Sequence, residues 1–244
     1  MLPPLPCTAC PLRSLPGYKS LPREKLTRIF ALKIGQRICA PGATILEEGR
    51  STPHLSTLLQ GWAFRYKSMP DGRRQILNIL LPGDLIGLQA ELMAGAPHSV
   101  EAVTEVTLCA FVPDTLWTLY RDEPELALDI TWLAANEERI VDDGLVSTGR
   151  RTALERVATL LVHLYKRAAA AGLAQQASIA FPLTQAHIAD TLGLSPVHTN
   201  RTLQQLRKRG LIRLAEGRLA IGDLATLSRV AAYWEAVAPG RPLL

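Results

Sequence analysis

The chain has 244 residues, 48% hydrophobic and 20% charged, which is typical of one large or two smaller globular domains and excludes disorder. No apolar run reaches the roughly 18 residues that a membrane span needs, and the start MLPPLPCTAC lacks a signal-peptide pattern. Four cysteines are too few for a disulfide framework. We therefore expect a cytoplasmic protein, and not a secreted, collagen-like or membrane protein.

The net charge of +5 is unevenly spread along the chain. Residues 1–149 hold fourteen basic and seventeen acidic residues, whereas residues 150–218 hold eleven basic and only three acidic ones. A basic segment of this kind is expected to meet a polyanion, although a solvated protein face gives the same pattern.

Residues 1–19 form a Cys- and Pro-rich arm. Five prolines in the first sixteen residues predict that this arm has no regular element. The stretch from Ser20 to Leu32 has an apolar spacing that predicts a short amphipathic helix beginning near Pro22.

Short apolar stretches separated by turn residues fill the rest of the segment 20–113. Asp71-Gly72 between two such stretches is a strong hairpin signal. This texture predicts an antiparallel β-roll of jelly-roll type, so the whole chain is expected to be an α+β protein.

Residues 114–147 are predicted to form a long helical stretch, interrupted near Pro124. Apolar residues recur there every three or four positions, at Leu126, Ile130, Leu133 and Ile140. A narrow seam with this spacing is typical of a coiled coil. Glu137 and Gly144 interrupt the seam. A helix lying on its own sheet gives a similar pattern, but the narrow stripe favours a dimer interface. Ser147-Thr148-Gly149 is interpreted as a hinge before a helix over residues 150–171.

The segment 148–222 contains the most informative motif. Thr184 is a good N-cap, Gly193 supplies the positive φ that a turn between two helices needs, and Ser195-Pro196 begins a second helix. Two short strands follow, LIRL and RLAI, joined at Glu216-Gly217. The segment is predicted to be a winged helix-turn-helix, and residues 223–244 a C-terminal helix and tail.

The second helix should bury Thr199, Leu203 and Leu206 and present a polar, basic face. We expect DNA contacts from Val197, His198, Asn200, Arg201, Gln204, Arg207, Lys208 and Arg218. Arginine can fork onto guanine, asparagine can pair with adenine, and the other cations can neutralise phosphate. These residues predict a protein that binds double-stranded DNA in the major groove.

The chain resembles the Crp/Fnr family of bacterial transcription regulators along nearly its whole length. The resemblance is carried by residues 81–91, 99–116 and, most specifically, LTQAHIADTLGLSPVHTNRTLQQLRKRGLI at 183–212. It implies a β-roll like that of cyclic-nucleotide-binding domains and a homodimer that reads a two-fold-symmetric promoter site and contacts RNA polymerase. Arg201 stands where the family has its base-reading arginine, but Val197 and Asn200 depart from its pattern, so the usual operator sequences do not carry over.

The resemblance also implies an effector pocket at Gly83, Asp84, Leu85, His98 and Ser99. In family members that respond to cyclic AMP, a Gly-Glu pair reaches the ribose and an Arg-Ser pair grips the phosphate. His98 stands in the place of that arginine, and a neutral histidine cannot provide its forked cation. We therefore expect no response to cyclic AMP.

Oxygen-sensing members of the family hold a [4Fe–4S] cluster on four cysteines. Cys7, Cys10 and Cys109 match three of these ligands, but Pro16 stands at the fourth, which disfavours the cluster. Cys7 and Cys10 are then candidate redox thiols exposed on the arm, whereas Cys109 is expected to be shielded in the roll and Cys39 to lie elsewhere in it. The identity of the effector, and whether one exists, stays open.

Two other classes of function are alternatives to a DNA-binding regulator. One is a ligand-binding or thiol-redox switch module whose winged helix mediates protein contacts. The other is an enzyme, which the sequence disfavours because it has no HExxH, GxSxG, P-loop or GxGxxG motif. The sequence does not distinguish an activator from a repressor.

Overall fold

The computed structural model describes all residues except 16, 52–53, 94 and 234–239. The described chain divides into two compact units. Unit 1 comprises residues 1–67, 79–138 and 239–244, and unit 2 comprises residues 68–78 and 139–238. Within the described ranges, no helix is both long and apolar enough to span a bilayer.

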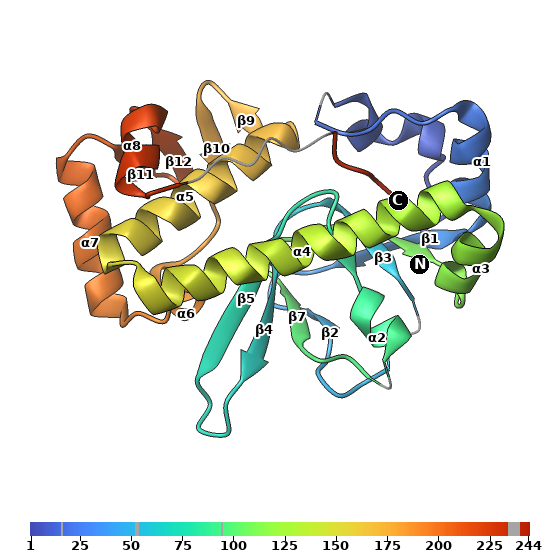
Figure 1. Ribbon diagram of the computed structural model, residues 1–244, viewed down its shortest axis with the longest axis horizontal. Helices are drawn as coiled ribbons and strands as arrows, with labels where there is room; N and C mark the ends of the chain where they lie inside the picture. The colour runs from blue at the N-terminus through green and yellow to red at the C-terminus, as the bar shows by residue number, and fades with distance from the viewer. Residues whose placement is uncertain (16, 52–53, 94, 234–239) are drawn as a thin grey trace. The chain divides into compact units, whose positions relative to one another are not determined.

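Short strands form the predicted antiparallel roll (Figure 1). They are β1 (Lys33–Cys39), β2 (Thr44–Leu46), β3 (Ser56–Gln60), β4 (Ala63–Ser68), β5 (Arg74–Leu80), β6 (Leu85–Ile86), β7 (Ser99–Ala102) and β8 (Val106–Phe111). One four-stranded sheet has the order β1-β8-β3-β6 and the other β2-β7-β4-β5. The hairpin predicted at Asp71-Gly72 is confirmed, because the Met69 amide donates to the Arg73 carbonyl across the turn, 2.7 Å away.

The arm is more ordered than its proline content predicts. It forms two short 3₁₀ helices, η1 (Cys7–Ala9) and η2 (Pro11–Ser14), so the expectation that it has no regular element was wrong. Proline is compatible with the first turn of a helix, where its missing N–H has no intrahelical partner, and Pro11 occupies that place in η2.

The α-helices described before residue 151 are α1 (Arg23–Ala31), α2 (Leu88–Leu92), α3 (Thr115–Asp122) and α4 (Pro124–Arg150), and α4 continues from unit 1 into unit 2 after residue 138. The helix predicted near Pro22 is confirmed by α1, with Pro22 as its N-cap. The hinge predicted at 147–149 is wrong, because α4 runs unbroken over 27 residues to Arg150. The Thr148 hydroxyl donates to the Gly144 carbonyl one turn earlier (2.8 Å), so its hydrogen bond stays within the helix.

The seam predicted on α4 faces the protein's own core. Leu126, Ile130 and Leu133 are 2%, 1% and 6% exposed in the single chain. Glu137, which interrupts the seam, forms a 2.6 Å ion pair with Arg65 of β4, a nearly buried side chain. The coiled-coil interpretation of these three positions is therefore corrected, because their side chains are buried within the single chain. Leu126 and Ile130 belong to the same apolar cluster as Leu59 and Phe111 of the roll. Ile140 is half-buried.

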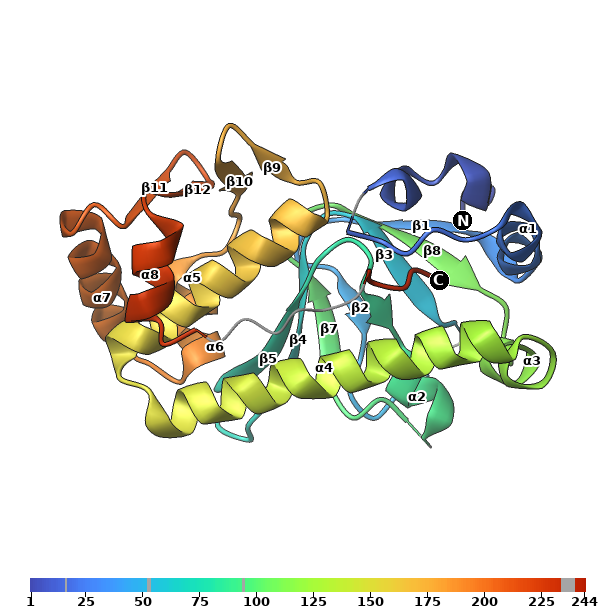
Figure 2. The same ribbon diagram turned by 45° about the horizontal axis from the view of Figure 1, so that its top comes forward.

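Unit 2 holds the remaining elements (Figure 2). They are α5 (Ala153–Ala170), β9 (Ala174–Gln175), β10 (Ser178–Ala180), α6 (Gln185–Leu192), α7 (Pro196–Lys208), β11 (Ile212–Ala215), β12 (Arg218–Ile221) and α8 (Leu224–Val230). Helix α5 packs against both α7 and α8. Leu161 and Val162 of α5 are fully buried, so this helix supplies the core on which the two-helix motif rests.

The predicted two-stranded wing is part of a four-stranded sheet of order β11-β12-β10-β9. Strands β9 and β10 were not predicted from the sequence; they are joined by Gln176 and Ala177, whose φ values are 48° and 58°. A two-residue turn with both φ values positive is usually marked by Asn or Gly. Because Gln176 and Ala177 occupy this turn in place of Asn or Gly, the sequence did not signal the hairpin.

Candidate nucleic-acid interface

The first helix of the motif, α6, begins at a reciprocal cap. The Thr184 hydroxyl accepts from the His187 amide (3.1 Å), and the Thr184 amide donates to Nδ1 of His187 (3.3 Å). Gly193 ends the helix at φ 63°, a conformation that costs glycine no strain. The N-cap and turn predicted from sequence are confirmed.

The second helix, α7, begins where predicted. The Ser195 hydroxyl accepts from the His198 amide (3.2 Å), and Pro196 occupies the first helical position. Thr199, Leu203 and Leu206 are buried as expected. Burial of this face fixes which side chains of α7 point outward.

The outward face of α7 holds most of the residues expected to contact DNA. The exposed ones are Val197, His198, Arg201, Gln204, Arg207 and Lys208, and Asn200 is half-buried. Val197 is 77% exposed, which is unusual for a β-branched apolar side chain and fits contact with a thymine methyl group. A helix of about 10–12 Å diameter fits a major groove about 12 Å wide.

Two of the expected cations make contacts inside unit 2. Arg218 donates from Nε to the Ser178 hydroxyl (3.0 Å) and from Nη2 to the same hydroxyl (2.9 Å). Arg207 donates to the Leu214 carbonyl of β11. Both arginines thus hold the wing: Arg218 links β12 to β10, and Arg207 links α7 to β11.

The residues expected to form the effector pocket lie in two places in unit 1. Gly83 is in a turn at φ 92°, where a Cβ atom would stand 2.5 Å from the Tyr18 hydroxyl oxygen. The buried Asp84 accepts from the Leu81 amide (2.7 Å) and from the guanidinium of Arg241. Leu85 begins β6 and is half-buried. No local sequence signal pointed to Arg241 as the partner of Asp84.

His98 and Ser99 lie at the start of β7. The Ser99 hydroxyl accepts from the Glu48 amide (3.0 Å). His98 is only 8% exposed, and burial, followed by the positive charge of Arg65, lowers its pKa to about 4. The imidazole is therefore neutral at pH 7 and carries no charge that could attract a phosphate.

The lowered pKa of His98 predicts a pH-dependent stability. The unfolded chain, with a histidine pKa near 6.5, binds more protons than the folded one between about pH 4 and 6.5. The free energy of unfolding should therefore fall by up to about 3 kcal/mol as the pH drops through this window, and be retained above it. Urea unfolding of parent and His98→Gln at pH 5 and pH 7 measures this contribution. His187, whose pKa is also lowered, is present in both proteins, so equal pH dependence in the two would contradict the prediction.

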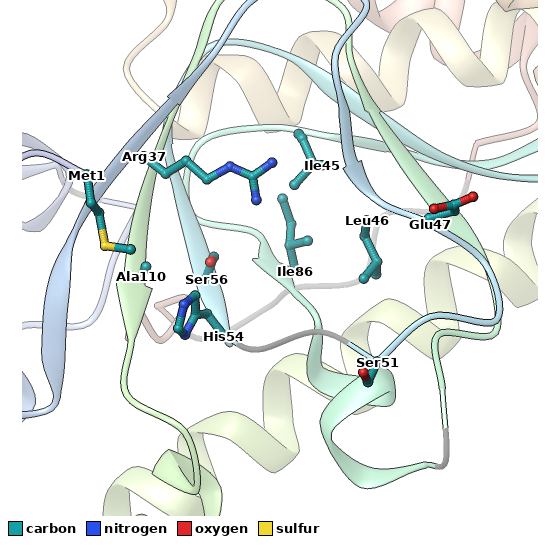
Figure 3. A pocket seen from close by; sticks show the side chains of 10 residues that line it. All are labelled: Met1, Arg37, Ile45, Leu46, Glu47, Ser51, His54, Ser56, Ile86 and Ala110. Carbon is teal, nitrogen blue, oxygen red and sulfur yellow. The ribbon is translucent and has the colours of Figure 1, made fainter.

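A small cavity of about 100 Å³ opens between β1, β2, β3, β6 and β8 (Figure 3). Its lining consists of Met1, Arg37, Ile45, Leu46, Glu47, Ser51, His54, Ser56, Ile86 and Ala110. None of the five expected effector-pocket residues is among the described residues that line this cavity. Pockets for drug-sized ligands usually measure about 300–1,000 Å³, so this cavity is suited only to a much smaller molecule.

The cysteines correct a further expectation. Cys7 and Cys10 are 2% and 7% exposed, so these thiols are buried rather than exposed on the arm. They share one apolar cluster with Cys109, which is fully buried as expected. The arm folds onto the roll because residues such as Leu12 have apolar surface to bury. Cys39 belongs to a different core cluster of the roll.

Lys33 interacts with the buried thiols of Cys7 and Cys109, and burial and charge shift the pKa values in this group. Burial lowers the pKa of Lys33, but its contacts with Cys109 and Cys7 raise it more. Burial raises the pKa of the Cys109 thiol, against the attraction of Lys33. Over the described residues, no group of three His, Cys, Asp or Glu side chains is placed to hold a metal ion, and Pro16 lies outside those residues. Three thiols and a proline do not fit a four-thiolate cluster.

A capped two-helix motif with a polar, basic outer face and an antiparallel wing defines a winged helix-turn-helix protein. Residues 155–230 match the Crp-like helix-turn-helix domain, and residues 36–123 match the cyclic nucleotide-binding domain. The nitrogen fixation regulation protein FixK of Bradyrhizobium diazoefficiens is 32% identical over 227 residues, 93% of this chain and 94% of that protein. The chain belongs to the Crp/Fnr family of transcription regulators.

Two further comparisons agree with this assignment. The transcriptional activator protein FnrL of Cereibacter sphaeroides is 27% identical, over 91% of this chain and 90% of FnrL. The structure of FixK2 from Bradyrhizobium japonicum superposes with a TM-score of 0.72 at 26% identity, over 84% of this chain and 98% of that one. The protein is a DNA-binding transcription regulator of the Crp/Fnr type. Members of this family are regulators and not enzymes, and they are typically dimeric.

Proposed function

We propose that this protein is a homodimeric transcription activator that acts in the cytoplasm and reads a pseudo-palindromic promoter site with α7. The observation that carries this proposal is the division of α7 into two faces. Thr199, Leu203 and Leu206 anchor the helix, while Val197, Arg201 and Gln204 are exposed. Activation of transcription is supported by the similarity to FnrL, a transcriptional activator. Contact with RNA polymerase is the route that we propose for it.

The side chains of α7 divide into two roles in this proposal. Val197, Asn200, Arg201 and Gln204, on the first turns, face the base edges. His198 lies beside them, and Lys208 at the end of the helix neutralises phosphate. Arg207 and Arg218 act through the wing, because their guanidinium groups already bond to Leu214 and Ser178.

The dimer interface is proposed on the outward face of α4, in place of the buried seam. Exposed residues recur there at 3/4 spacing and comprise Leu128, Thr131, Ala135, Glu138, Asp142 and Leu145. Leu128 and Leu145 are 68% and 72% exposed. Large apolar side chains this exposed on one helix face are typical of a contact with a second helix. We call these six residues the α4 outer stripe.

Selection from a random pool of DNA duplexes tests the proposed function. The enriched sequences should form a pseudo-palindrome with half-site centres about 10 base pairs apart, as helix-turn-helix dimers require. Affinity for random duplexes should fall steeply with salt because Lys and Arg release counterions from phosphate. A lack of enrichment, together with no salt-dependent binding to random DNA, would favour a winged helix that contacts proteins instead.

A further inference from the structure

The last five residues, 240–244, return to the sensor half of the chain and belong to unit 1 (Figure 2). Their backbone pairs with the arm like a short strand. The Lys19 amide donates to the Arg241 carbonyl (2.8 Å), and the Arg241 amide donates to the Gly17 carbonyl (2.9 Å). Main-chain pairing of this kind is a common way for a domain to hold an extended peptide.

The Arg241 side chain meets a matching acceptor site. Its guanidinium forms an ion pair with Asp84 and donates to the Gly83 carbonyl (3.3 Å). The side chain of Asp84 is 7% exposed and that of Arg241 is 22% exposed. A carboxylate so buried is stable only when paired with a cation, so Asp84 selects an arginine at this place in the tail.

The Tyr18 side chain completes the acceptor site. Its hydroxyl donates to the Pro82 carbonyl (2.7 Å), which fixes the turn that carries Gly83 and Asp84. The space beside Gly83 is filled by the Tyr18 ring, since a Cβ there would meet it at 2.8 Å. The arm, the turn and the tail therefore form one continuous contact.

The two terminal leucines are buried beyond the ion pair. Leu243 and Leu244 are 4% and 6% exposed and belong to the apolar cluster that holds Cys7, Cys10 and Cys109. The Leu243 carbonyl accepts from Arg13 (2.9 Å), and the Leu244 carbonyl accepts from the Thr57 hydroxyl (2.9 Å). Arg241, Leu243 and Leu244 are thus each held by hydrogen bonds, and Pro242 between them is buried.

We propose that unit 1 contains a peptide-binding groove whose ligand is the chain's own C-terminal segment Arg-Pro-Leu-Leu. The groove recognises one arginine by Asp84, two leucines by the apolar cluster, and the extended backbone by the arm.

Carboxypeptidase digestion of a recombinant chain that ends at Leu244 tests the groove, with leucine release as the readout. The parent should release its terminal leucines at least about a hundredfold more slowly than the free peptide Gly-Arg-Pro-Leu-Leu, because the enzyme needs an undocked tail. Arg241→Ala and Asp84→Asn should each speed release at least about tenfold, since breaking a buried ion pair is strongly unfavourable. The matched control Arg23→Ala, an exposed arginine of α1, should leave the rate of the parent unchanged.

Two further measurements separate loss of docking from loss of folding. The circular dichroism spectrum of Arg241→Ala should match the parent, because the change lies in the tail. The exchanged pair, Asp84→Arg with Arg241→Asp, should slow release again relative to either single change. Leucine release from the parent at the rate of the free peptide, or an unchanged rate in a folded Arg241→Ala protein, would overturn the proposal. DNA binding plays no part in this readout, so the result is independent of the proposed function.

Discussion

Replacing Arg201 by alanine is expected to weaken binding to the selected operator about 10–100-fold, or about 1–3 kcal/mol, while leaving the fold intact. Arg201 is exposed on α7, and its side chain makes no contribution to the buried face of Thr199, Leu203 and Leu206. Alanine cannot form the two hydrogen bonds that an arginine makes to guanine. The ratio of affinities for the operator and for a mutated operator should therefore also fall. Titration of parent and variant with both duplexes at one salt concentration measures the effect.

The matched comparison for Arg201 is Lys208→Ala, an exposed lysine at the end of α7 that we assign to a phosphate contact. Loss of a phosphate contact should weaken binding to all duplexes by a similar factor and reduce the salt dependence. Thermal unfolding should show both variants within about 0.5 kcal/mol of the parent, as is usual for surface changes. Equal affinity of Arg201→Ala and parent for the operator would contradict the assignment of Arg201 to base reading.

Replacing both Leu128 and Leu145 by aspartate should split the dimer. These side chains lie near the two ends of the α4 outer stripe and are exposed in the single chain. A carboxylate in a helix–helix contact would be buried without a partner, which strongly disfavours association. Sedimentation at micromolar concentration should show a monomer, and operator affinity should fall by more than a hundredfold as the two half-sites are no longer bound together.

The burial on α4 supplies two contrasting controls for this experiment. Leu133→Asp should destabilise the folded chain itself, because Leu133 is only 6% exposed in the single chain. Met69→Asp places the same charge on an exposed side chain of the β4–β5 hairpin and should leave the dimer intact. A dimeric Leu128→Asp/Leu145→Asp protein would refute the α4 outer stripe as the interface.

The α4 helix shows where reading the sequence reached its limit. Leu126, Ile130 and Leu133 have the spacing of a coiled-coil seam, but that spacing only says that one helix face is apolar. The partner of the face is decided by what else the chain brings to it. Here the ion pair between Glu137 and Arg65, from an element far away in sequence, shows that the partner is the roll.

The cysteines and the effector residues illustrate the same limit. The proline-rich arm has no periodicity that predicts where it packs, yet Cys7 and Cys10 are buried beside Cys109. Asp84 was matched to a ligand-binding place by resemblance, whereas its partner in the fold is Arg241, which lies 157 positions away. Neither contact has a local signal because both join segments that only the folded chain brings together.

The sequence by itself determined the winged helix-turn-helix and the roll. Thr184, Gly193 and Ser195-Pro196 fix helix ends by hydrogen bonds and backbone angles that are local, so they could be identified residue by residue. Glycine turns marked the strands of the roll for the same reason. Only the tertiary structure decided which face of α4 is buried, how the Gln176-Ala177 hairpin widens the wing, and where the arm and tail dock. Those features depend on burial between distant segments, which periodicity and spacing do not specify.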